Sequence, residues 1–182
     1  SGSESQPKEA SQYVQSQPVT DHDSNLTEKR LRQKLQQYIE DGAMEIDNLG
    51  QQLVIRIKEN GAFPAGSAYL QPQLGPILMQ VAVVLADIPG AITVSGHTDD
   101  TGVNSELFRN NWDLSARRAV AVATEMEKVQ TLNGDRIQVM AFADKKPLVP
   151  NTSAENRRMN RRVEIAIAQG KAKQTEQINL IE

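Results

Sequence analysis

The sequence has no cysteine among its 182 residues, few aromatic side chains (4%) and no long apolar run. The absence of cysteine excludes disulfide bonds, thiol catalysis and cysteine-bound metal sites. The best apolar stretch, residues 77–88, is interrupted by Gln80 and Asp87, whereas a membrane-spanning helix needs about 20 apolar residues. The formal net charge of -3 gives no general attraction to nucleic acid. These absences favour one globular domain with an aliphatic core and some additional chain.

The additional chain is predicted at the N-terminus. Residues 1–24 are rich in Ser and Gln and show no apolar period, which is typical of a flexible tether. The first three residues, Ser-Gly-Ser, are typical of a cloning remnant, so we expect the chain to be part of a longer protein. Helical spacing of apolar side chains then predicts an amphipathic helix over 25–42, carrying Leu31, Leu35, Tyr38 and Ile39. Its apolar stripe could cap the following domain or pair with a second copy.

Residues 43–169 alternate between strand and helix patterns. Strands at 43–47 and 51–58 flank a turn signal and predict a hairpin. A loop is expected over 59–67. Helices are expected from Pro72 or Pro76 to Ile88, with Met79, Val83 and Val84 widening the apolar face, and over 111–129. Further strands are expected near 91–96, 136–143 and 163–167, with a basic turn at 157–162 and a solvated tail at 170–182. The order of these strands and helices along the chain predicts an α/β (α+β) two-layer sandwich with a mixed β-sheet and helices packed on one face.

The second long helix carries an arginine on its apolar side. With Leu114 at zero and 100° per residue, Arg118 falls at about 40°, inside the apolar stripe, and Arg117 at about 300°, outside it. An arginine cannot lose its charge, so an inward guanidinium needs an anion. Two anions fit: a carboxylate of the same chain in a permanent salt bridge, or a ligand carboxylate or phosphate.

Asp99 is the natural companion of Arg118 because it directly follows a buried strand. Ligands of α/β sheets tend to bind at the carboxyl ends of strands. The positive end of the helix that begins near Asn111 could face the same crevice. A carboxylate and a guanidinium in one pocket form a receptor for a zwitterion, and they discriminate against ligands that offer only one of the two charges.

Three segments resemble the signatures of the OmpA-like peptidoglycan-binding domain. They are Gly96-His97-Thr98-Asp99, then Asn111-x-x-Leu114-Ser115-x-x-Arg118-Ala119-x-x-Val122-x-x-x-Met126, then Asn160-Arg161-Arg162-Val163-Glu164, with Phe63-x-x-Gly66-Ser67 before the first long helix. Two positions depart from the family pattern. Met126 replaces the usual Leu, and Pro64-Ala65 stand where many members have an acidic residue after the Phe, which puts a ligand contact from that loop in doubt.

The resemblance implies a non-catalytic domain that binds peptidoglycan and needs neither a metal nor another cofactor. Asp99 and Arg118 would hold the zwitterionic diaminopimelate end of the stem peptide. The implied peptidoglycan-binding residues are Asp99, Arg118, Thr98, Asn111 and Ser115, with Phe63, Gly66, Asn160 and Arg161 as secondary candidates.

Within this family the chain is similar to the periplasmic part of flagellar stator B subunits, and most similar to their sodium-driven type. This implies a single-pass inner-membrane protein of a Gram-negative bacterium, a homodimer that joins a polytopic A subunit and contacts basal-body ring proteins. Outer-membrane porins and wall-associated lipoproteins carry the same domain and form the alternative.

An alternative of another class is a metal-assisted hydrolase built on His97, Asp99 and Asp100. The chain has only two histidines, and His22 lies in the predicted tether, so a metal would depend on one imidazole and carboxylates. We therefore interpret His97 as a structural hydrogen-bonding residue below the pocket.

Overall fold

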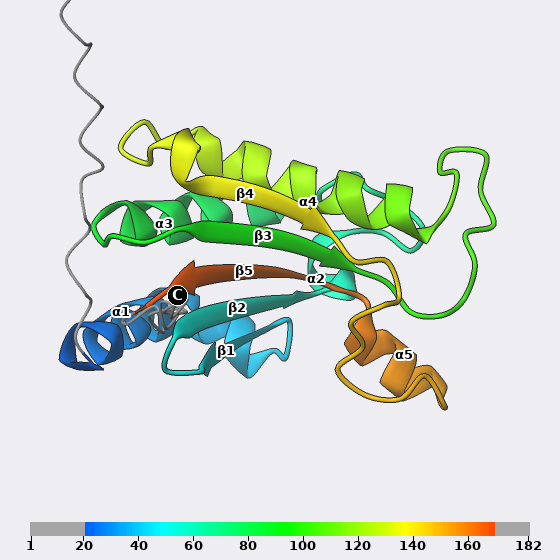
Figure 1. The fold of residues 1–182 in the computed structure, drawn as a ribbon, viewed down its shortest axis with the longest axis horizontal. Coiled ribbons are helices and arrows are strands. Elements are labelled where there is room, and N and C mark those ends of the chain that lie inside the picture. Colours follow the sequence, from blue (N-terminus) through cyan, green and yellow to red (C-terminus); the bar gives the residue numbers. More distant parts are fainter. Residues whose placement is uncertain (1–20, 170–182) are drawn as a thin grey trace, which may run out of the picture.

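The computed structural model describes residues 21–169, which form a five-stranded mixed sheet with strand order β1-β2-β5-β3-β4 (Figure 1). The strands are β1 (Met44–Asn48), β2 (Gln52–Lys58), β3 (Ile92–His97), β4 (Ile137–Ala141) and β5 (Arg162–Ala168). β3 and β4 are parallel, and the other neighbouring strands are antiparallel. The predicted hairpin is confirmed as β1 and β2, with Met44 opposite Ile57 and Asn48 opposite Leu53.

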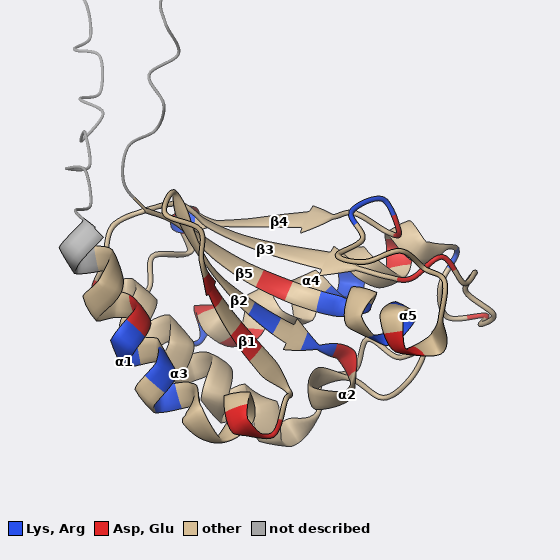
Figure 2. Ribbon diagram, turned by 90° about the horizontal axis from the view of Figure 1, so that it is seen from below, with Lys and Arg blue, Asp and Glu red and all other residues tan. Residues whose placement is uncertain are grey.

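Three long helices cover one face of the sheet and leave the other without a helical layer (Figure 2). The helices are α1 (Asp21–Glu40), α2 (Glu59–Ala62), α3 (Gly75–Ala86), α4 (Asn111–Glu127) and α5 (Ala154–Asn160), with 3-10 turns at Pro72–Leu74 and Gly134–Arg136. Of these, α1, α3 and α4 form the layer, and the short helices α2 and α5 lie at the end of the sheet toward which β3 runs (Figure 1). The predicted two-layer fold is therefore confirmed.

The core lies between the sheet and the three long helices. Alternate side chains of β2 and β5 point into it, because successive side chains of a strand face opposite sides. Full burial of one such aliphatic side chain stabilises the fold by about 1.5 to 3 kcal/mol. The core residues that the strands contribute are Met44, Ile46, Leu53, Ile55, Ile57, Ile92, Val94, Val163, Ile165 and Ile167.

Helix α1 caps the domain, which decides between the two alternatives that the sequence leaves open. Leu31 and Leu35 are fully buried, and α1 packs against β1 and α3. The helix begins at Asp21, before the predicted start at residue 25, and Ser24 and Thr27 near its start are also buried. The rest of the predicted tether, residues 1–20, and the predicted tail lie outside the described residues.

Two predictions near the end of the sheet are wrong. The basic segment 157–162 is not a turn, because α5 runs through most of it and Arg162 begins β5. Ser153 caps α5 by accepting a hydrogen bond from the backbone N–H of Asn156, and this capping residue was the signal available in the sequence. Residues 59–62, expected to be loop, form α2.

The buried apolar face of α3 is narrower than predicted. Val84 is buried as expected, whereas Met79 and Val83 are exposed. The two exposed residues lie four positions apart and therefore share the side of the helix that points away from the sheet.

Candidate functional site

The carboxyl end of β3 positions Asp99. Asp99 Oδ1 accepts a hydrogen bond from the backbone N–H of Thr101 (2.8 Å), and the Thr98 hydroxyl donates to the Asp99 carbonyl (2.9 Å). Asn111, the first residue of α4, donates to the carbonyls of Thr101 (3.1 Å) and Asp99 (3.5 Å). Thr98 and Asn111 thus shape the backbone around Asp99, whose side chain is 8% exposed.

Gly96 brings α4 against β3 just before this point. A Cβ atom at Gly96 would lie 1.9 Å from the backbone carbonyl oxygen of Ser115, so only glycine allows the two backbones to come this close. The Ser115 hydroxyl accepts a hydrogen bond from the backbone N–H of Ala143 and donates to the carbonyl of Trp112. This contact places Arg118, one turn further along α4, beside the end of the strand.

Arg118 points inward and Arg117 outward, as the helical wheel predicts. The side chain of Arg118 is 2% exposed and that of Arg117 is 60% exposed. The Arg118 guanidinium lies 5.0 Å from the centre of the Phe63 ring, a cation–π contact, and its Nε donates to the carbonyl of Ser67 (2.8 Å).

Arg118 has an ion-pair partner within the chain, which sequence reasoning did not identify. Its Nη1 donates to Glu59 Oε2 at 2.5 Å, so the salt-bridge alternative left open by the sequence is realised. The guanidinium is nevertheless not saturated, because Arg118 Nη2 is buried and has no hydrogen-bond partner among residues 21–169. A buried donor without an acceptor costs about 1 to 3 kcal/mol.

Arg161 joins Glu59 to Asp99. Its Nε donates to Glu59 Oε1 (3.2 Å) and its Nη1 donates to Asp99 Oδ2 (2.6 Å). Asp99, Arg161, Glu59 and Arg118 therefore form a row of alternating charges, which we call the four-charge chain. Burial alone would lower the pKa of Arg161, but the hydrogen bond to Asp99 and the attraction of Glu59 and Asp99 raise it above its ordinary value.

Several predicted site residues have structural contacts instead. Ser115 is fully buried and both of its hydroxyl contacts are internal. Asn160 is also fully buried, and it holds the loop before α5 through the backbone of Leu148 and Val149. Phe63 is buried beneath Arg118, and exposed Gly66 has the positive φ (66°) that a turn before Ser67 requires. A direct ligand contact through Ser115 or Asn160 does not fit this geometry.

The positive charge at the N-terminal end of α4 is neutralised by side chains of the same chain. The Asn110 side chain accepts from the backbone N–H of Asp113, and Asp113 in turn accepts from the backbone N–H of Arg109 and from the side chain of Arg117. These two hydrogen bonds lower the pKa of Asp113. The Asp113 carboxylate thus takes the place that we expected for a ligand anion at this helix end.

His97 has the structural role that the sequence predicts. It is 4% exposed, its Nε2 lies 2.9 Å from the hydroxyl of Ser95, and its ring stacks on Phe142. Burial, followed by the positive charge of Arg162, lowers its pKa to about 4. Within residues 21–169, no group of three or more His, Asp or Glu residues is arranged to hold a metal ion.

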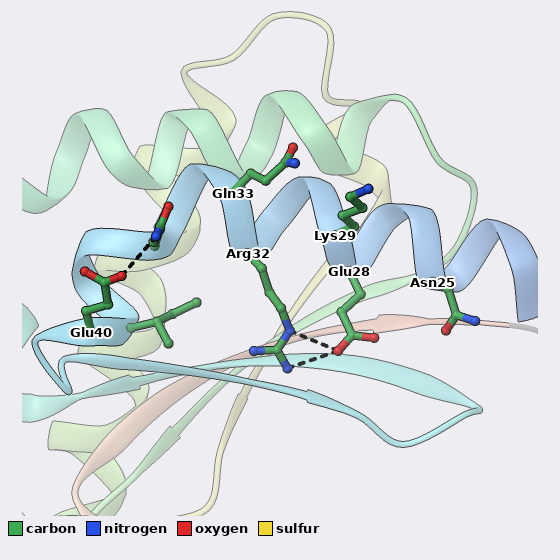
Figure 3. A pocket seen from close by; sticks show the side chains of 8 residues that line it. Asn25, Glu28, Lys29, Arg32, Gln33 and Glu40 are labelled. Atoms are coloured by element: carbon green, nitrogen blue, oxygen red, sulfur yellow. Dashed lines mark hydrogen bonds and ion pairs between the residues drawn. The ribbon is translucent and has the colours of Figure 1, made fainter.

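A hollow of about 500 Å³ lies elsewhere on the molecule, along α1 (Figure 3). Glu28 and Arg32 pair within it, and Arg32 also donates to the carbonyl of Ile46 at the outer edge of β1 (2.9 Å). Such a contact covers an edge strand that could otherwise pair with another chain. All of the residues that line this hollow belong to α1, so it is separate from Asp99 and Arg118.

The sheet, the helices on one face and the charged residues after β3 define a small binding domain of the OmpA type. The model of the OmpA family matches residues 62–161, and the chain belongs to this family. The matched segment contains Asp99, Arg118 and Arg161, whereas Glu59 precedes it. The domain is non-catalytic, in line with its family.

The chain is similar to motility proteins and to a cell wall anchor. Motility protein B from Escherichia coli K12 is 31% identical over 89% of this chain, which spans 59% of that protein. The cell wall anchor of the T6SS from Pseudomonas aeruginosa is 29% identical, with a TM-score of 0.69 over 77% of this chain and 97% of the other. The periplasmic domain of Helicobacter pylori MotB is 25% identical, with a TM-score of 0.64 over 72% and 84%. The chain spans between 42% and 62% of the length of the curated relatives that it matches.

None of the helices within residues 21–169 combines the length and the apolar character required to cross a membrane.

Proposed function

We propose that this chain is the wall-binding domain of a flagellar stator B subunit, and that it anchors the ion-driven torque generator to peptidoglycan. Similarity to Motility protein B over most of the chain supports the motor assignment. The observation that carries the binding function is the position of Asp99 and Arg118. Opposite charges lie at one end of the sheet, and the guanidinium retains a nitrogen without a partner.

The ligand is the diaminopimelate end of the stem peptide, which carries an ammonium and a carboxylate on one carbon. Asp99 accepts the ammonium group, and Arg118 donates to the carboxylate through the N–H groups of its guanidinium. Thr98 and Asn111 hold the loop that orients Asp99. Phe63 fixes the plane of the Arg118 guanidinium from below.

The parent protein, in this proposal, is a single-pass protein of the inner membrane of a Gram-negative bacterium, and this domain lies in the periplasm. It acts as a homodimer together with a polytopic A subunit and lies near the basal-body rings. The sodium-driven (PomB) type of B subunit is the subtype that we assign. The likeness to the periplasmic domain of MotB supports this location.

Cosedimentation with purified, protein-free sacculi tests the binding function. We compare wild type with Asp99→Ala, Arg118→Ala and the matched control Arg117→Ala, which removes the same charge one position away on the exposed face of α4. Wild type and Arg117→Ala should pellet with the sacculi. Both site variants should stay in the supernatant while their circular dichroism remains native. Full binding by both site variants would rule the proposed pocket out.

A swimming assay separates a stator from another wall anchor, since the domain also resembles the anchor of a secretion system. The full-length subunit carrying Asp99→Ala should reach the membrane but fail to restore motility to cells that lack it. Normal swimming by this variant would place the domain in another wall-anchored protein, such as a porin or a lipoprotein.

A further inference from the structure

The four-charge chain leaves both proposed ligand-binding residues with an internal partner. Asp99 is paired with Arg161, and Arg118 is paired with Glu59. A third contact, from Arg161 to Glu59, joins the two pairs. A zwitterionic ligand therefore meets a site in which its ammonium and its carboxylate each have a competitor.

The competitor at Asp99 is the most exposed of the four groups. The Arg161 side chain is 28% exposed, whereas those of Asp99, Glu59 and Arg118 are 8%, 11% and 2% exposed. A charge that already reaches water loses little when one ion pair opens, whereas a buried charge left unpaired is costly. Arg161 also follows directly after α5, outside both the helix and β5. It is thus the group of the four that can move aside.

We propose that Arg161 is an exchangeable counter-ion, which in the free domain occupies the position of the ligand ammonium at Asp99. When a ligand binds, Arg161 leaves Asp99 and keeps Glu59 as its ion-pair partner. This inference rests on the proposed function of the Asp99 and Arg118 pocket. In the exchange, the ligand ammonium replaces Arg161 at Asp99 and the ligand carboxylate replaces Glu59 at Arg118. Arg161 and Glu59, already 3.2 Å apart, then neutralise each other.

The exchange makes the site selective for ligands that carry both charges. The four groups sum to zero charge, and a zwitterion keeps the sum at zero with every charge paired. An amine without a carboxylate leaves the cluster with one excess positive charge, and an acid without an amine leaves one excess negative charge. Because excess charge in a buried cluster is costly, Arg161 and Glu59 act as specificity-determining residues.

Three ligands of matched length test the inference by NMR titration of the whole chain. They are meso-diaminopimelate, with both charges at each end, cadaverine, with ammonium groups only, and pimelate, with carboxylates only. The variant is Arg161→Gln, and the control is Arg158→Gln, which removes the same charge from the neighbouring helix α5 at an exposed position. Arg161→Lys restores the charge without the forked donor geometry.

Wild type and Arg158→Gln should prefer diaminopimelate over both other ligands. In Arg161→Gln the cluster has one excess negative charge, so cadaverine should bind about tenfold tighter relative to diaminopimelate, and pimelate more weakly. Arg161→Lys should restore most of the wild-type preference.

An unchanged preference in Arg161→Gln would overturn the inference while leaving the proposed function intact, provided that wild type binds diaminopimelate and sacculi. Loss of diaminopimelate binding as complete as in Arg118→Ala would also overturn it, because Arg161 would then be a ligand contact. Failure of wild type to bind diaminopimelate or sacculi would remove the proposed function and this inference together.

Discussion

Two clusters of alternating charges, similar in composition, occur in this domain, but they differ in which elements supply their residues and in how completely these residues are paired. The first is the four-charge chain at the end of β3. The second, which we call the sheet-face cluster, consists of Glu45, Arg56, Arg162, Glu164 and the adjacent His97. Figure 2 shows acidic and basic positions side by side on β1, β2 and β5, on the face that the long helices leave uncovered. Both alternate in sign, and in each only one side chain is more than a quarter exposed: Glu45 (44%) in the sheet-face cluster and Arg161 (28%) in the four-charge chain.

The sheet-face cluster is built from strand register. Glu45, Arg56 and Glu164 lie opposite one another on three neighbouring strands, and Arg162 and His97 form the next row. Arg162 also donates to the carbonyls of Asn160 and Lys146. Burial by itself would raise the pKa of Glu164, but the hydrogen bond and charge of Arg162 lower it overall. The arginines of this cluster have their carboxylate partners within the sheet, and the cluster is suited to stability.

The four-charge chain is built from four separate segments and is less complete. It contains the partly exposed Arg161 and an Arg118 nitrogen without a partner. The comparison shows that alternating charges stabilise a fold where the strand register brings them into contact with one another. Such charges can bind a ligand where one hydrogen-bond donor has no partner within the fold.

The largest expected effect comes from removing Arg162 in the sheet-face cluster. Arg162→Met leaves Glu164 with fewer partners and two carbonyls without a donor, so the free energy of unfolding should fall by about 3 to 5 kcal/mol. Urea denaturation measures it, and Arg158→Met is the control with an exposed arginine. The folded fraction should still bind sacculi. A loss below 1 kcal/mol would contradict a structural role for this cluster.

A pH dependence should follow from His97. Its pKa is lowered to about 4 in the folded chain, against about 6.5 in the unfolded chain, so the neutral form stabilises the fold above pH 6.5. This stability is lost as the pH falls from 6.5 to 4 and is on the order of 3 kcal/mol.

Urea denaturation of wild type and His97→Gln at several pH values isolates this contribution. The difference between their unfolding free energies should be constant above pH 6.5 and should change between pH 6.5 and 4, because only the wild type binds a proton there. A difference that stays constant down to pH 4 would show that His97 does not titrate as the structure indicates.

A smaller loss of stability, but a complete loss of binding, is expected from Gly96→Ala. The new Cβ would meet the Ser115 carbonyl, so α4 must shift, at a cost of about 1 to 3 kcal/mol. The shift moves Arg118 relative to Asp99 without altering any charge. Sacculus cosedimentation of the folded variant measures the consequence. Binding equal to that of wild type would mean that the spacing of the two charges is not critical.

Local patterns were sufficient to predict much of the fold. The period of the apolar residues correctly predicted the hairpin, the long helices and the inward side of α4 on which Arg118 lies, because these depend on geometry within one element. The short helices α2 and α5 were missed, since elements of one or two turns depend on caps and tertiary contacts more than on periodicity.

The sequence by itself determined that Arg118 must face the core and that Asp99 must follow a buried strand, because both properties follow from local period and chain order. Only the tertiary structure decided their partners. Glu59 is 59 positions from Arg118, and Arg161 is 62 positions from Asp99 and 102 from Glu59. The pairing of such distant residues depends on how the sheet brings α2 and the start of β5 together, and no local pattern encodes it.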